Sequence, residues 1–152
     1  MRTTERIVVP APAAAVFAQV DRLEAYPAWL PLVHSAEEAP AADGDPGPAW
    51  AVELRAKVGP LARSKRLRMV RAEHVPDTTV RFERRELDGR EHAAWILRVE
   101  LAEVVASAGA ATELTMHLSY EGSLWTGGLL ERVLDDQVRQ GREGLTRLLA
   151  TR

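Results

Sequence analysis

A long amphipathic helix, predicted over Leu124–Arg152 at the end of the chain, places the strongest constraint on the fold. With 3.6 residues per turn, its apolar and charged side chains separate onto two sides. The apolar side carries Leu130, Leu134, Val138, Leu145 and Leu148. The charged side carries Glu131, Arg132, Asp135, Arg139, Arg142 and Glu143. An apolar side of this length needs an equally long apolar surface elsewhere in the chain.

Gly141 interrupts the apolar side at its centre, where a leucine would be expected. A glycine inside a helix costs about 1 kcal/mol relative to alanine. It also leaves a dent that another group can approach. Two interpretations stay open, because the dent can admit Trp95 or Trp50 from a facing sheet, or it can border a cavity.

Strands with two-residue periodicity supply the matching apolar surface. Trp50 to Val58 alternates apolar residues with Ala51, Glu53, Arg55 and Lys57, so one face is apolar and the other mostly charged. Four further strands are predicted, separated by turns at 59–60, 76–77, 88–89 and 107–110. These strands span Ala62–Val75, Val80–Leu87, His92–Val105 and Thr112–Glu121.

The first 48 residues are predicted to add two strands, two short helical pieces and a loop. The strands are Arg6–Val9 and Val33–Ala39. A helix over Pro12–Val20 turns Val16, Phe17 and Val20 inward. Asp21 is expected to cap a second helical piece that ends near Tyr26-Pro27 or Leu30-Pro31. Ala41–Pro48 has the composition of a loop.

This order predicts an α+β fold, with a curved antiparallel sheet of about six to seven strands wrapped around the C-terminal helix. At 152 residues, we expect a single domain over residues 1–152. The net charge of −2 gives no electrostatic case for nucleic acid or an anionic membrane. Absent cysteines exclude disulfides and thiolate catalysis. With no signal peptide and no membrane span, a cytoplasmic and, by composition, bacterial protein is expected.

The order of elements resembles the helix-grip fold of the START superfamily, also called SRPBCC, and within it the polyketide cyclase/dehydrase-like lipid-transfer family. The resemblance covers nearly the whole chain. It is carried by the segments 7–12 (IVVPAP), 16–17 (VF), 21–31 (DRLEAYPAWLP), the strand-rich middle and the helix from Leu129 to Leu149. It implies an elongated apolar cavity between the sheet and the last helix, which binds lipids, polyketides, quinones or similar molecules.

No catalytic motif is recognisable, so the catalytic residues stay unassigned. His34, His74, His92 and His117 are scattered and show no two-histidine spacing of a metal site. A GxSxG elbow, a Walker A loop and a GxGxxG stretch are all missing from the sequence. No metal and no cofactor are therefore expected.

Two polar residues are predicted on surfaces that face inward. Arg84 continues the side of Val80 and Phe82, where it either holds a ligand anion or lies where the strand leaves the core. Gln137 lies on the apolar side of the helix and needs a hydrogen-bond partner from protein, water or ligand. Together with the apolar candidates, the predicted ligand-binding residues are Trp50, Leu54, Phe82, Arg84, Trp95, Leu97, Met116, Tyr120, Leu134, Gln137, Val138 and Gly141.

A basic run occupies the strand predicted over Ala62–Val75, at Arg63, Lys65, Arg66, Arg68 and Arg71. We interpret it as an outward strand face that pairs with acidic residues such as Glu83 and Glu86. Lys65 and Arg71 nevertheless share the side of Leu67 and Met69. Either a bulge intervenes, or the strand ends lie outside the core.

Three functions remain open. The first is a noncatalytic binder or carrier of a hydrophobic small molecule. The second is a polyketide aromatase/cyclase or dehydratase-type enzyme, in which Arg84, Gln137, Tyr120 or a histidine performs acid-base work. The third is an interaction module that forms a homodimer through an exposed sheet edge.

Overall fold

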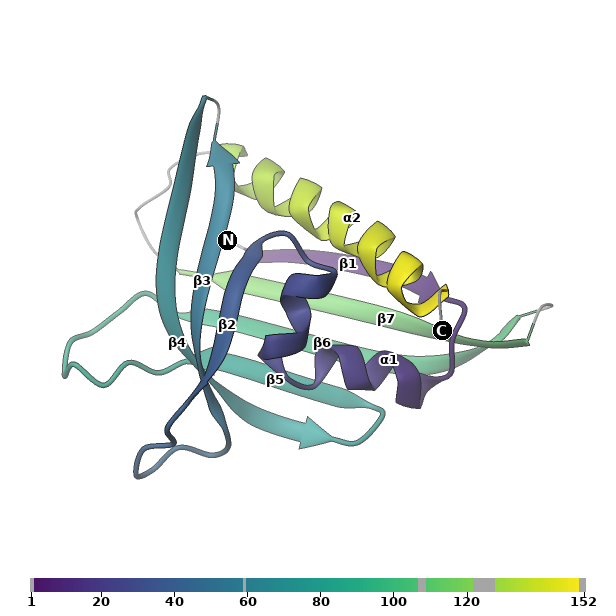
Figure 1. The fold of residues 1–152 in the computed structure, drawn as a ribbon, viewed down its shortest axis with the longest axis horizontal. Coiled ribbons are helices and arrows are strands. Elements are labelled where there is room, and N and C mark those ends of the chain that lie inside the picture. Colours follow the sequence, from purple (N-terminus) through teal and green to yellow (C-terminus); the bar gives the residue numbers. More distant parts are fainter. Residues whose placement is uncertain (1, 59, 107–108, 122–127, 151–152) are drawn as a thin grey trace.

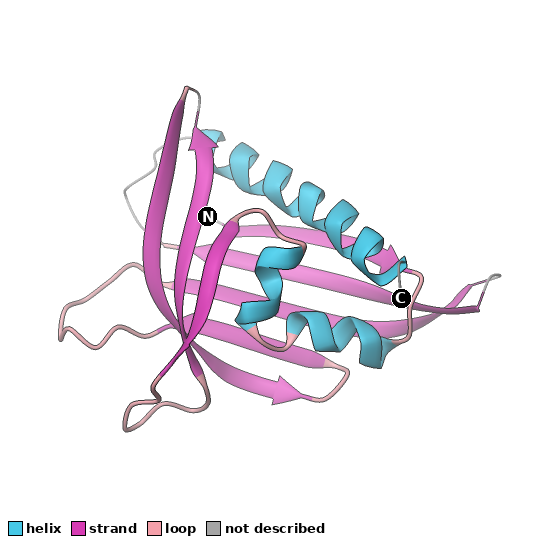
Figure 2. Cartoon of the chain, in the orientation of Figure 1, coloured by secondary structure: helices cyan, strands magenta, loops and turns pink. Residues whose placement is uncertain are grey.

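The computed structural model describes residues 2–58, 60–106, 109–121 and 128–150. In this part of the chain, a curved seven-stranded sheet carries the helices on one face (Figures 1 and 2). The elements in chain order are β1 (Arg2–Val9), α1 (Ala13–Val20), the 3-10 helix η1 (Leu23–Ala28), β2 (Val33–Ala39), β3 (Ala49–Val58), β4 (Leu61–Val75), β5 (Thr79–Arg84), β6 (Trp95–Ala106), β7 (Gly109–Tyr120) and α2 (Gly128–Ala150).

Neighbouring strands are antiparallel throughout, in the order β1-β7-β6-β5-β4-β3-β2. From β2 to β7 the chain therefore runs back and forth between adjacent strands. β1 instead pairs with β7, from Arg2 opposite Ser119 to Val9 opposite Thr112. The two strands nearest the N-terminus thus form opposite edges of the sheet, and α1 and η1 connect them across its inner face (Figure 1). The predicted α+β architecture is confirmed.

Two predicted strand boundaries were wrong at the connection between β5 and β6. β5 ends at Arg84 rather than Leu87, and β6 begins at Trp95 rather than His92. Asp88 explains this difference, because its carboxylate accepts hydrogen bonds from the Arg90 backbone N–H at 3.0 Å and from His92 Nε2 at 2.8 Å. These side-chain bonds hold the connection as a turn instead of a strand ladder.

The prediction that Asp21 caps the second helical piece was also wrong. Asp21 ends α1, and its backbone N–H bonds to the Phe17 carbonyl at 2.9 Å. Arg22, in an extended conformation, precedes η1 and gives it no side-chain cap. The Asp21 carboxylate instead lies 3.5 Å from His74 Nε2. Val16, Phe17 and Val20 are buried as predicted.

The structure of β4 explains how its basic residues can share the side of the strand that carries Leu67 and Met69. A bulge lies between Arg71 and Glu73, and near the other end of the strand the side chains of residues 61–64 are exposed. Both alternatives left open by the sequence therefore occur. Beside the bulge, Arg71 reaches across to the C-terminal end of α1 and donates a hydrogen bond to the Asp21 carbonyl at 2.8 Å.

α2 lies within the predicted helix, whose residues 124–127 and 151–152 are outside the described part of the chain. Val138 and Leu145 are buried, as the helical periodicity predicts. The side chains of Leu130 and Leu134 are also outside the described residues. Thr3 on β1 donates a hydrogen bond to the Asp135 carboxylate, which fixes α2 to that edge of the sheet.

The dent at Gly141 is filled by residues that follow η1, not by Trp95 or Trp50. A Cβ at Gly141 would come within 2.7 Å of Leu30 Cδ1. Gly144, one helical turn further, lies even closer to this segment, because a Cβ there would overlap the Trp29 carbonyl oxygen. The two glycines therefore let the chain at Trp29–Leu30 pack directly against the helix.

Candidate ligand-binding site

The inner face of the sheet is an apolar surface built from every second residue of the central strands. Its buried members include most of the predicted ligand-binding residues. These predicted residues are Trp50, Leu54, Phe82, Trp95, Leu97, Met116 and Tyr120. The other buried residues of the face include Val52 and Ala56 on β3, Leu67 and Met69 on β4, Val99 on β6, and Leu114 and Leu118 on β7. The helices cover this face, so it forms one wall of any internal site (Figure 2).

One part of this wall is filled by an aromatic cluster. The ring of Phe82 lies edge-on to Trp50 at 5.5 Å and to Tyr26 at 6.1 Å between centroids. The Trp50 indole N–H donates to Glu24 Oε2 at 2.8 Å, and the Tyr26 hydroxyl donates to the Val20 carbonyl at 2.8 Å. Trp50 and Phe82 are thus engaged with η1 and act as core residues.

Burial, with a smaller contribution from the charge of Asp21, raises the pKa of Tyr26 well above its ordinary range. Its phenol therefore remains a neutral hydrogen-bond donor at any physiological pH. Trp29, whose ring packs on Tyr26 at 4.8 Å, donates its indole N–H to the Gln19 carbonyl at 3.0 Å. The polar atoms of this cluster are satisfied within the protein.

Trp95 and Tyr120 form a second aromatic pair on the inner face. They lie opposite one another on β6 and β7, and their rings are 4.5 Å apart. The Trp95 indole nitrogen is buried and has no hydrogen-bond partner among the described residues. A buried donor left unpaired costs about 1–3 kcal/mol, so such a group marks a place where water or a ligand supplies the missing acceptor.

A hollow of about 550 Å³ opens between α2 and β3. It lies where β3 continues beyond the end of β2, because the β2–β3 ladder stops at Val33 opposite Leu54. Its volume lies within the roughly 300–1,000 Å³ that ligand pockets occupy. The lining residues are Pro31, Arg55, Ala56, Lys57, Ala62, Arg132, Asp136, Gln137 and Gln140.

Gln137 connects this hollow with the side of α2 that faces the sheet. Its Oε1 is buried and has no hydrogen-bond partner among the described residues. The neighbouring Val138 is buried in the core, and Ala56 across the hollow continues the inner face of β3. Gln137 therefore presents an unsatisfied amide oxygen where the opening meets the apolar interior. It is the predicted site residue that the structure places most clearly in a hollow.

Arg84 points inward, as its position on the strand predicts, but its guanidinium is occupied by the protein. Its side chain is only 8% exposed, and Nε donates to Glu86 Oε1 at 3.0 Å. Nη1 donates to the Ala93 carbonyl at 3.2 Å, and Nη2 lies 3.3 Å from His92 Nδ1. These bonds tie Arg84, the last residue of β5, to the connection that follows it. Its guanidinium is therefore already bonded and is not available to a ligand anion.

Lys65 is the other cation on the inward side of this region, opposite Leu54. Burial, and then the charge of Arg84, lower the pKa of Lys65, while Glu86 acts in the opposite direction. Glu86 thus pairs with Arg84 and acts only weakly on Lys65. The sequence prediction that Glu83 also faces the basic run was wrong, because Glu83 pairs with Arg81 at 2.7 Å and with Arg85 at 2.6 Å.

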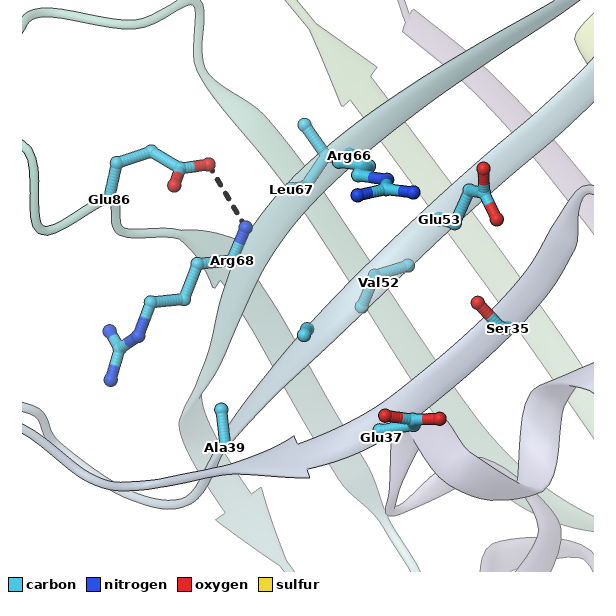
Figure 3. Close-up of a pocket in the computed structure, with 10 residues that line it drawn as sticks. Ser35, Glu37, Ala39, Val52, Glu53, Arg66, Leu67, Arg68 and Glu86 are labelled. Carbon is cyan, nitrogen blue, oxygen red and sulfur yellow. Dashed lines mark hydrogen bonds between the residues drawn. The ribbon is translucent and has the colours of Figure 1, made fainter.

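The outer face carries a different hollow, of about 470 Å³, over β2, β3 and β4 (Figure 3). Charged residues of both signs line it, including Glu37, Glu53 and Arg66. At its edge, Arg68 donates to Asp45 Oδ2 at 2.7 Å, and its backbone N–H donates to Glu86 at 3.0 Å. The hydrogen bond from Arg68, with one from the Ala42 N–H, lowers the pKa of Asp45. This polar surface does not suit an apolar ligand.

The four histidines lie beside four different carboxylates and do not come together. These pairs are His34–Glu53, His74–Asp21, His92–Asp88 and His117–Glu100, at 2.8 to 4.0 Å. Within the described ranges, no three His, Asp or Glu side chains are arranged to hold a metal ion. No helix among the described residues has both the length and the apolar character needed to cross a membrane.

Comparison with known proteins places the chain beside others of the same fold. A family model described as "Polyketide cyclase / dehydrase and lipid transport" matches residues 1–150. A START superfamily protein from Mycobacterium smegmatis has a TM-score of 0.74 at 16% identity, with 99% of this chain and 97% of that chain covered. A protein from Thermus thermophilus has a TM-score of 0.69 at 20% identity, with 99% of each chain covered. No curated protein sequence matches significantly.

Proposed function

Because the chain belongs to the polyketide cyclase/dehydrase and lipid transport family, we propose that it binds a hydrophobic small molecule between α2 and the inner face of the sheet. One observation carries this proposal. The hollow between α2 and β3 contains Gln137, whose buried Oε1 has no partner among the described residues. A hydroxyl or N–H of a ligand, or a water that enters with it, can donate the missing hydrogen bond to Oε1, and the apolar part of the ligand is buried against the interior.

The ligand would contact the half of the inner wall that lies outside the aromatic cluster of Tyr26, Trp50 and Phe82. Trp95, Leu97, Met116 and Tyr120 belong to this half, and the indole N–H of Trp95 supplies a second unsatisfied group. Gln137 and Val138 would contact it from α2, and Leu54 would contact it from β3. Leu134 remains a proposed contact from its position in the helix. Trp50, Phe82, Arg84 and Gly141 would support the site from the surrounding core.

We propose ligand binding without catalysis as the primary activity, because the indole of Trp95 and the amide of Gln137 neither gain nor lose a proton near neutral pH and so cannot act as acid or base. Tyr120 favours the alternative, a polyketide cyclase or dehydratase. Its phenol belongs to the inner face, beside Trp95, and can serve as an acid. In that case a bound polyketide would be recovered with the mass change of dehydration, whereas a carrier would return it unchanged.

A matched pair of variants on β3 tests the binding proposal. Ala56→Phe should fill the hollow from the inner face, whereas Ala51→Phe adds the same ring to the outer hollow. We expect delipidated wild-type protein and Ala51→Phe to bind the neutral fluorophore Nile red equally, and Ala56→Phe to bind it at least about tenfold more weakly through loss of ligand volume. Native mass spectrometry of undelipidated protein should also detect a co-purified apolar molecule.

Circular dichroism and the unfolding midpoint would establish that both variants are folded before their affinities are compared. Equal Nile red binding by the two phenylalanine variants would place the probe outside the hollow. Absence of binding by the wild-type protein, together with an empty protein in the mass spectrum, would refute the proposed function.

A further inference from the structure

The opening between β3 and α2 carries an excess of positive charge. Among the described residues, Arg55, Lys57 and Arg132 line it, against one carboxylate, that of Asp136. The net positive charge of these lining residues contrasts with the net charge of the whole chain, which is −2. Charges of one sign around a concave opening with low-dielectric walls concentrate the field there and attract the opposite charge. The opening is therefore an electropositive site on a slightly acidic protein.

Internal ion pairs do not explain these cations. Arg55 is only loosely paired with Glu53, at 3.8 Å, while the Asp136 carboxylate accepts a hydrogen bond from Gln140 at 3.0 Å. Lys57 and Arg132 have no ion-pair partner in the part of the chain that the structure describes. They face the opening from β3 and from α2. An anion between the two elements would be attracted by both.

The groups change character from the rim of the opening towards the interior. Lys57 and Arg132 are exposed at the rim, whereas Gln137 brings a buried amide oxygen and Ala56 an apolar wall. Ala56 leads on to Leu54 and Val52 along the inner face. Cation, neutral hydrogen-bonding group and apolar surface thus follow one another, in the order that a single-chain amphiphile presents from its head to its tail.

We propose that the natural ligand is an amphiphile with an anionic head group, a carboxylate or a phosphate, which binds Lys57 and Arg132 while its apolar chain enters past Gln137. This inference rests on the proposed function and specifies its ligand class. Arg84 and Lys65 are not the head-group site, because neither lines the hollow and the Arg84 guanidinium is bonded to Glu86 and to the Ala93 carbonyl. The head group remains at the water-exposed rim, where its charge is not desolvated and the ion pairs with Lys57 and Arg132 form without a large penalty.

Decanoate and 1-decanol provide the test, because they have the same chain length and differ in the charge of the head. Their affinities for the delipidated protein are measured by displacement of Nile red at low ionic strength. We expect the wild-type protein to prefer decanoate by about three- to tenfold, the effect of two exposed ion pairs. The double variant Lys57→Gln/Arg132→Gln should lose this preference and bind 1-decanol as the wild type does.

The matched control is Arg139→Gln/Arg142→Gln, which removes the same charge from exposed positions of α2 that do not line the hollow. It should retain the preference for decanoate, and high salt should reduce the preference of the wild type. Decyl phosphate, tested in the same way, identifies which anionic head binds more tightly.

Equal binding of decanoate and 1-decanol by the wild type would overturn this inference and leave the proposed function intact. Equal loss of the preference in both double variants would also overturn it, because the effect would then come from net charge. If neither compound nor Nile red binds, the proposed function itself fails.

Discussion

For Arg84, the sequence predicted the side of the strand on which it lies but not the residue with which it pairs. Strand periodicity places it on the inward side, which is where the structure has it. The pattern does not show that Glu86, two residues further, accepts its Nε–H at 3.0 Å. That contact depends on β5 ending at Arg84, which frees Glu86 to turn back. A local pattern can thus predict the side on which a residue lies but not the partner it meets.

Replacement of Arg84 should therefore affect stability rather than ligand affinity. Arg84→Leu removes the guanidinium and leaves the Glu86 carboxylate without its main partner. We expect a loss of about 2 kcal/mol in the free energy of unfolding, less than the roughly 3–5 kcal/mol of a fully buried pair, because Glu86 is partly exposed and lies near Lys65. Urea denaturation measures this loss.

The double variant Arg84→Leu/Glu86→Gln completes the cycle and should be less destabilised than the sum of the two single changes. Additive losses would mean that the two side chains do not stabilise each other. A large drop in Nile red affinity for folded Arg84→Leu would restore Arg84 to the ligand site.

At the level of elements, α2 and the chain after η1 fit together through two glycines. The sequence draws attention to Gly141, because it interrupts an apolar side, but not to Gly144. A spacing of three residues places both on one face of the helix, which is the signal that could have been used. Which segment enters the dent could not be predicted, since Trp29 and Leu30 lie more than 100 residues away along the chain.

The two glycines should respond differently to alanine. At Gly141 the new Cβ meets the end of the Leu30 side chain, which can rotate, and the helix gains about 1 kcal/mol in propensity, so stability should change little. At Gly144 it meets the Trp29 backbone, which cannot move without shifting η1. We expect Gly144→Ala to lose about 1–3 kcal/mol, the usual cost of overpacking.

Thermal and urea unfolding of the two variants provide the comparison. Since each change adds one methyl group to the same helix, each serves as the control for the other. Equal effects at the two positions, or a stabilised Gly144→Ala, would contradict the packing described for Trp29.

Across the whole molecule, the sequence predicts the order of elements well and the site poorly. Strand alternation and helix periodicity are local patterns, and they were sufficient for the seven-stranded sheet and α2. The hollow instead depends on Pro31, Ala56 and Gln137 meeting across three distant segments. No local pattern contains that information. The roles of Trp50 and Phe82, two of the predicted ligand-binding residues, could not be predicted from the sequence either, because only the placement of η1 shows that their rings pack in a filled core.

Ligand binding should protect one part of the molecule from hydrogen exchange. A molecule between α2 and β3 would hold these elements together, so the amides of α2 and of residues 54–57 should exchange more slowly in the presence of decanoate. At a decanoate concentration 100 times its dissociation constant, binding adds about 2.7 kcal/mol to the free energy of unfolding. The distal ends of β6 and β7, around residues 102–106 and 109–112, should be unaffected, as measured by mass spectrometry. Slower exchange in the other strands but not in α2 or residues 54–57 would contradict a site between α2 and β3.

The pairing of β1 with β7 also has a consequence for synthesis of the protein. β1 is made before the other strands of this sheet, and in the described part of the chain its sheet partner is at residues 112–119, so this edge can close only after β7 has been made. Until then, the hairpins from β2 to β6 can form, but β1 has no strand to pair with. Nascent chains halted before β7 should therefore keep the N-terminal strand accessible to chaperones, which bind exposed apolar segments during translation.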